Sequence, residues 1–146
     1  MRNYQCIVPL FMLLFVASSA FAQSGTDQEE TGKSPASHVL SLDAGKRWKA
    51  NPETTTGVQN MIKYMESFTP KDEVQAYLKL KEQLQEEMGG IFQACNMTGE
   101  AHEQLHAFLV PIFEYFEGLE STDLNTCQNS YKQLKEHLKL YAKFFK

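Results

Sequence analysis

Apolar residues in the C-terminal two thirds of the chain recur at intervals of three and four, which is the spacing of one face of an α-helix. Four such stripes follow one another, over residues 51–68, 69–95, 98–118 and 121–146. The connections between them are short, which favours antiparallel neighbours. No run alternates with a period of two, as a half-buried strand would. The pattern predicts an all-α fold, an antiparallel up-down-up-down four-helix bundle over residues 47–146.

Particular residues predict where the helices begin and end. Asn51 is expected to cap the first helix, with Pro52 at its first position. Gly118 is expected to end the third, because glycine readily adopts the left-handed conformation at a helix C-terminus. The second stripe includes Phe92 among its inward positions. The fourth keeps its spacing as far as Phe145, so we expect one continuous helix to the end of the chain.

The N-terminal residues 1–22 have the pattern of a secretory signal peptide. Arg2 is followed by the uncharged apolar stretch 7–17 and by Ala20-Phe21-Ala22, a typical cleavage site. A membrane anchor needs roughly 20 apolar residues, and this run thins at Ser18. We therefore expect cleavage, no membrane span in the mature chain, and a periplasmic or secreted protein.

Residues 23–46 are rich in Ser, Thr, Gly, Glu and Lys. Such a segment has little apolar surface to offset its ordering entropy, so it is expected to be a disordered tether. Leu40 and Leu42 near its end are expected to lie against the folded domain with Trp48.

The charge of the chain argues against one class of partner. Its 14 basic and 18 acidic residues give a formal net charge of -4. This is the wrong sign for a protein that neutralises phosphates, so nucleic acid is not expected as a partner. Three aromatic residues outside the stripes, Tyr64, Tyr115 and Phe144, are candidates for a protein-binding surface.

The turn between the second and third helices gathers metal-binding residue types. His102 and His106 are four apart, so they share one helical face. Cys95 ends the preceding helix and Met97 lies in the turn. Thiolate and thioether favour copper, above all Cu(I), whereas zinc would use Cys and His but not Met97. In the alternative interpretation Cys95 and Met97 pack in the interior and the histidines flank an apolar stripe, with one ring nitrogen in water.

A second interpretation of the same segment is catalytic. Residues 102–106 match the H-E-x-x-H motif, in which Glu103 would act as the general base of a zinc metalloprotease. The downstream residues of the metzincin extension are absent, since Leu109 and Ile112 stand where Gly and His are required. His137 is expected at a depth similar to His106 and is a possible additional ligand.

The two cysteines outside the signal peptide are expected to remain free thiols. A rise of about 1.5 Å per residue along a helix places Cys95 and Cys127 roughly 25 Å apart, whereas a disulfide needs Cα atoms within about 7 Å. Cys127 lies on the inward seam of the fourth helix and is expected to be buried.

Three segments carry a resemblance to a known group: residues 47–55, residues 91–102 and the pair Leu105-His106. They resemble small exported proteins of Bacteroidetes, over roughly residues 42–146. The resemblance implies a periplasmic setting and supplies no activity. The functional expectation therefore comes from the residues: copper or zinc binding for handling or sensing rather than an enzyme. The alternatives are a non-metal structural or protein-interaction module and an H-E-x-x-H hydrolase.

Overall fold

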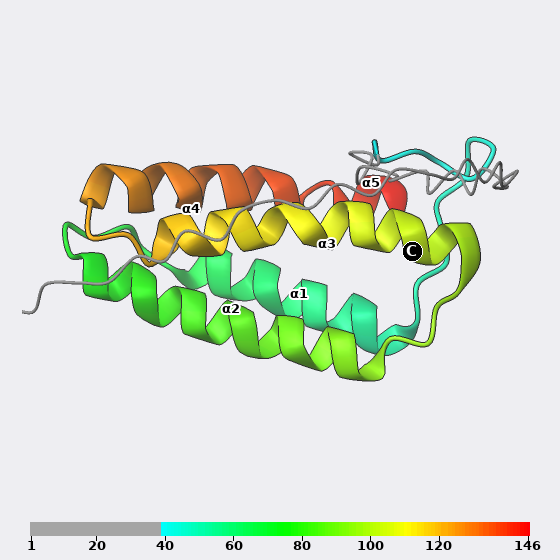
Figure 1. Cartoon of the computed structure of the whole chain (residues 1–146), viewed down its shortest axis with the longest axis horizontal. Helices are drawn as coiled ribbons and strands as arrows, with labels where there is room; N and C mark the ends of the chain where they lie inside the picture. The colour runs from blue at the N-terminus through cyan, green and yellow to red at the C-terminus, as the bar shows by residue number, and fades with distance from the viewer. Residues whose placement is uncertain (1–38) are drawn as a thin grey trace, which may run out of the picture. The chain divides into compact units, whose positions relative to one another are not determined.

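The computed structural model describes residues 39–146. The predicted signal peptide, and the predicted tether as far as residue 38, lie outside the described residues. Five helices follow in order: α1 (Pro52–Ser67), α2 (Val74–Ala94), α3 (Gly99–Leu119), α4 (Leu124–Leu138) and the single turn α5 (Tyr141–Phe144) (Figure 1). The residues from 39 onward contain isolated bridges but no strand. The predicted all-helical class is confirmed.

The four long helices share one core. α1 packs along α2 and α3 packs along α4, while α2 also contacts α3 and α1 also contacts α4. Most of the buried apolar residues come from the predicted stripes, and full burial of each large apolar side chain stabilises the fold by about 1.5–3 kcal/mol. They include Val58, Met61 and Met65 of α1, Tyr77, Leu84, Met88 and Ile91 of α2, Leu105, Phe108, Leu109 and Ile112 of α3, and Cys127, Leu134 and Leu138 of α4.

The end of the chain differs from the expectation of one continuous fourth helix. α4 ends at Leu138, and a turn leads into α5. The main chain then pairs with Trp48, whose N–H donates to the Phe144 carbonyl at 2.7 Å and whose carbonyl accepts from Lys146 N–H at 2.9 Å. The prediction of one continuous helix was wrong because the Phe144 carbonyl and the Lys146 N–H form hydrogen bonds with the main chain of Trp48 instead of within a continued α4. Phe145 is nevertheless buried, as its spacing predicts.

Gly118 has a different role from the predicted one. α3 continues through it to Leu119, and Gly118 is not among the described residues with a positive φ. A Cβ atom at Gly118 would lie 1.8 Å from Ser130 Oγ and 2.7 Å from Ser130 Cβ. The prediction that Gly118 ends the helix was wrong. The absence of a side chain instead allows α3 and α4 to approach closely.

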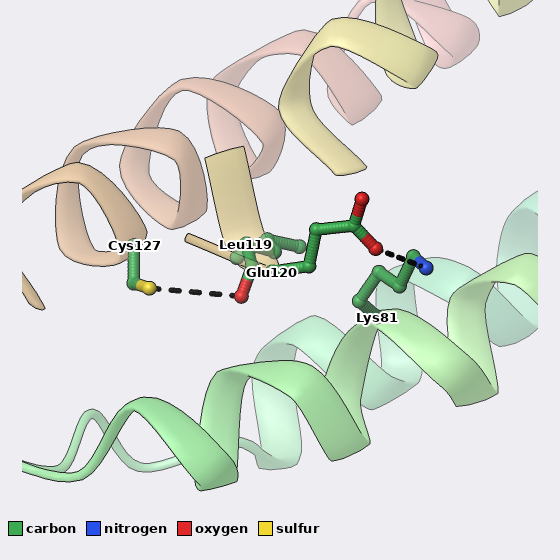
Figure 2. Close-up of polar contacts among 4 residues, drawn as sticks. All are labelled: Lys81, Leu119, Glu120 and Cys127. Atoms are coloured by element: carbon green, nitrogen blue, oxygen red, sulfur yellow. Dashed lines mark hydrogen bonds and ion pairs between the residues drawn. The ribbon is translucent and has the colours of Figure 1, made fainter. Parts of the chain in front are cut away.

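Near the same end, α3 is linked to its neighbours by two polar contacts (Figure 2). Lys81 Nζ of α2 lies 2.6 Å from Glu120 Oε2, a partly exposed pair of the kind that contributes about 0–1 kcal/mol. Cys127 of α4 is buried, and its Sγ donates to the Leu119 carbonyl at 3.6 Å. Outside the figure, the same Sγ donates to the Ser121 carbonyl at 3.2 Å. Burial raises the pKa of the Cys127 thiol. The prediction that Cys127 is buried is confirmed.

Candidate metal centre

The four main predicted ligands lie in the connection between α2 and α3 and in the first turns of α3. Cys95 is the C-cap of α2: its N–H donates to the Ile91 carbonyl at 2.9 Å while its own backbone is already extended. Four residues later α3 begins at Gly99, whose φ of +63° lies in the left-handed region that side chains disfavour. The glycine therefore allows the chain to reverse within residues 95–98.

Asn51 holds the end of α2 in place. It occupies the predicted N-cap position of α1, but its side chain accepts no backbone N–H of that helix. Its Nδ2 instead donates to Glu53 Oε2 at 2.8 Å and to the Ala94 carbonyl at 3.3 Å, and its Oδ1 accepts from Thr54 Oγ1 at 2.5 Å. The carbonyl group next to Cys95 is thus fixed by the start of α1.

The structure brings Cys95 and His102 together. Cys95 Sγ lies 3.7 Å from His102 Nδ1, and both side chains are half-buried. The ring of His106, one turn further along α3, lies edge-on to that of His102 with the centroids 4.4 Å apart. His106 is exposed. A thiol and two imidazoles therefore form a continuous series from the end of α2 along the first two turns of α3.

The other predicted ligands lie in different surroundings. Met97 is half-buried against the hydrophobic core and lines a groove of about 390 Å³ with residues 49–52. Glu103 is exposed. His137 Nε2 lies 2.7 Å from the Phe108 carbonyl, to which it donates, and its ring packs on Phe108 and Tyr115. Because Met97 packs against the core, it would have to give up this contact to act as a metal ligand.

A full set of zinc ligands is not assembled in this arrangement. Within residues 39–146, no three His, Cys, Asp or Glu side chains form a group that could hold a metal ion. The pair of Cys95 and His102 is thus the assembled part of the candidate site. Both cysteines of the described residues are free thiols, as predicted.

A buried polar contact beside these residues was not predicted. Gln104 of α3 is buried, and its Oε1 accepts from Ser41 N–H at 2.8 Å. The Ser41 carbonyl in turn accepts from Trp48 Nε1 at 2.7 Å. These two hydrogen bonds attach the segment before α1, at Ser41, to α3. The point of attachment, Gln104, lies between His102 and His106 in the sequence. The only signal in the sequence is a polar residue at an inward position of a helix.

Comparisons of the chain with protein-family models, curated proteins and solved structures find no match. Among the helices of residues 39–146, none has the combined length and apolar content needed to cross a membrane.

Proposed function

We propose that this chain binds a soft or borderline transition-metal ion, copper or zinc, through Cys95 Sγ and His102 Nδ1, with His106 as the next ligand. The observation that carries the proposal is the 3.7 Å separation of the sulfur and the nitrogen. A thiolate and a neutral imidazole are the ligands that copper and zinc prefer in proteins. The role is metal handling or sensing rather than catalysis.

The separation fits one bridging ion. Metal–sulfur and metal–nitrogen bonds of about 2.3 and about 2.0 Å are typical of zinc sites. Two such bonds meet at an angle of roughly 120° when sulfur and nitrogen are 3.7 Å apart. That angle suits a three-coordinate ion and is close to the tetrahedral one. The spacing of the two atoms is therefore compatible with one bridging cation.

The small number of assembled ligands favours Cu(I) over zinc. A structural zinc site takes four protein ligands, whereas Cu(I) accepts fewer and prefers soft sulfur. The proposed third ligand is His106, which is exposed and whose ring centroid lies 4.4 Å from that of His102. A fourth from Met97 would cost its contact with the core.

The proposal includes the location and architecture of the chain. Residues 1–22 direct export and are cleaved, residues 23–46 form a tether whose end is fastened to α3 through Ser41 and Gln104, and the bundle acts in the periplasm or outside the cell. The order of helix contacts, α1 with α2, α2 with α3, and α3 with α4, supports an up-down-up-down bundle. The uncharged apolar stretch and the cleavage pattern support export.

Metal titration of the purified chain under reducing, oxygen-free conditions tests the site. We expect one equivalent of Cu(I), or of Zn(II), to bind with micromolar or tighter affinity. Cys95→Ser and His102→Ala should abolish this binding, and His106→Ala should weaken it. Cys127→Ala is the matched control, since it removes the other described thiol. Weaker affinity in the native chain, or binding indifferent to Cys95 and His102, contradicts the proposal.

The hydrolase alternative has little support from the described residues. Glu103 is exposed, and within residues 39–146 no group of three His, Cys, Asp or Glu side chains that could hold a catalytic metal ion is assembled. Turnover of a peptide library by the metal-loaded chain, lost in Glu103→Gln, would restore that alternative.

A further inference from the structure

One surface of the bundle exposes large apolar side chains. Phe92 of α2 and Phe113 and Val110 of α3 are 45%, 44% and 55% exposed. The rings of Phe92 and Phe113 stack across the two helices, 6.0 Å apart and 3° from parallel. We call these three residues, with Gly89 beside them, the α2–α3 face. The helices of the described chain expose no other large apolar side chain to this extent.

The location of this surface differs from the sequence-based expectations. Spacing placed Phe92 on the inward stripe, but it lies on the outer flank of α2 against Phe113. The proposed partner-surface residues Tyr64, Tyr115 and Phe144 are instead half-buried against the core. An exposed apolar surface is therefore present on the bundle, but on other residues.

Gly89 is an unexplained glycine within this face. Glycine inside a helix costs about 1 kcal/mol relative to alanine. At Gly57 and Gly118 close packing requires it, because a Cβ atom would lie 2.5 Å from Ile91 or 1.8 Å from Ser130. A Cβ atom at Gly89 would meet nothing within 4 Å, as is also true of the neighbouring Gly90. Its bare backbone, one turn before Phe92, permits close approach by a segment from outside.

The charges along α3 indicate which kind of partner would bind to the α2–α3 face. Along α3 the exposed positions Glu103, His106, Val110, Phe113 and Glu117 recur with alternating spacings of three and four. This is the pattern of a helix-packing seam. The apolar centre is thus bounded by a carboxylate at each end, and α3 contains no Lys or Arg.

The same charges argue against two other occupants. If a second copy docked through this stripe, a two-fold axis would place Glu103 and Glu117 opposite glutamates in either orientation, and facing like charges are unfavourable. An anionic membrane surface would repel them as well. A helix with apolar side chains on one face and Lys or Arg beside them complements both the centre and the ends.

We propose that the α2–α3 face docks a basic amphipathic helix of a partner protein. Its apolar side chains would lie on Phe92, Val110 and Phe113, its backbone would approach Gly89, and its cationic residues would pair with Glu103 and Glu117. The proposal does not depend on the metal site.

Fluorescence anisotropy with a panel of labelled synthetic helices tests the docking. The helices carry Leu or Phe at i, i+4 and i+7, flanked by Lys, with versions in which Lys is replaced by Glu. We expect micromolar binding of the basic versions to the full chain. The double variant Phe92→Ser/Phe113→Ser should weaken it at least about tenfold. Glu103→Gln/Glu117→Gln should weaken it about tenfold at low salt, since charge pairs at an exposed rim are screened at high salt.

Matched variants control for general effects of surface polarity and charge. Val39→Ser changes an apolar side chain that is 82% exposed and lies outside the face. Glu66→Gln/Glu136→Gln removes two exposed carboxylates elsewhere. Both should bind the peptides as the native chain does. Circular dichroism and thermal melting establish that each variant is folded.

Four outcomes would overturn the proposal. They are failure of every basic helix to bind, equal binding of the acidic versions, binding unaffected by the Phe92 and Phe113 changes, and equal loss in the control variants. In parallel, sedimentation at increasing protein concentration detects self-association, and flotation with phosphatidylglycerol vesicles detects lipid binding. Either activity, if lost in the Phe92→Ser/Phe113→Ser variant, would assign the face to a second copy or to lipid instead.

Discussion

The close approach of α3 and α4 at Gly118 makes a direct prediction about stability. In Gly118→Ala the new Cβ atom would lie 1.8 Å from Ser130 Oγ and 2.7 Å from Ser130 Cβ. Normal contacts between carbon atoms are about 3.5–4.0 Å, so the helices must separate locally or Ser130 must shift. Overpacking of this kind costs about 1–3 kcal/mol, and the better helix propensity of alanine offsets about 1 kcal/mol. We expect the free energy of unfolding to fall by up to about 2 kcal/mol.

Gly90→Ala is the matched control for this change. Gly90 is also inside a helix, but a Cβ atom there would meet nothing within 4 Å. Alanine should therefore raise the free energy of unfolding by up to about 1 kcal/mol. Adding Ser130→Ala to Gly118→Ala removes the closer of the two clashing atoms and leaves the other. The double variant should recover part of the lost free energy of unfolding. It should therefore be more stable than the sum of the effects of the two single substitutions predicts.

Urea denaturation followed by circular dichroism measures these differences. The comparison uses free energies extrapolated to water, provided that the denaturant slope is the same for all variants. If Gly118→Ala stabilises the chain as much as Gly90→Ala, or if Ser130→Ala gives no recovery, close packing is not the reason for glycine at position 118.

Other side chains give further predictions. The hydroxyl of buried Tyr77 has no hydrogen-bond partner in the described chain, so Tyr77→Phe should leave stability unchanged or raise it by up to about 1 kcal/mol. Tyr131→Phe removes a 3.0 Å bond to a main-chain carbonyl of α1 and should cost about 1 kcal/mol; equal effects in urea denaturation would contradict this contrast. In a thiol-labelling experiment half-buried Cys95 should react in the folded chain, whereas buried Cys127, whose pKa is raised by burial, should react only on unfolding. The hydrogen bonds that Asp123 accepts from the side chain and the backbone N–H of Thr126 lower its pKa below the ordinary value of an aspartate. Its contribution to stability is therefore present above about pH 4 and is lost as the pH falls through the lowered pKa. The loss of stability between neutral and acidic pH should be smaller in Asp123→Ala than in the native chain, as measured by urea denaturation at each pH. If the two chains show the same pH dependence, the Asp123 carboxylate does not contribute in this way.

The candidate metal site was only partly accessible from the sequence. His102 and His106 share a helical face because they are four residues apart, and Cys95 is near them because the turn between the helices is short. These are local relations, and the structure agrees with them. The positions of Met97 and His137 depend on which surfaces the core covers. Met97 packs inward, and His137 lies against Phe108.

The sequence by itself determined the all-helical class, the approximate extent of the first three helices and most of the core, because apolar residues recur every three to four positions along one face of an α-helix. The tertiary structure decided everything that requires two distant segments to meet. It set the pairing of Trp48 with the C-terminus, the contact of Gly118 with Ser130, and the exposed stack of Phe92 on Phe113. Such contacts depend on the rotation and spacing of packed helices, which the hydrophobic pattern of a single helix leaves undefined.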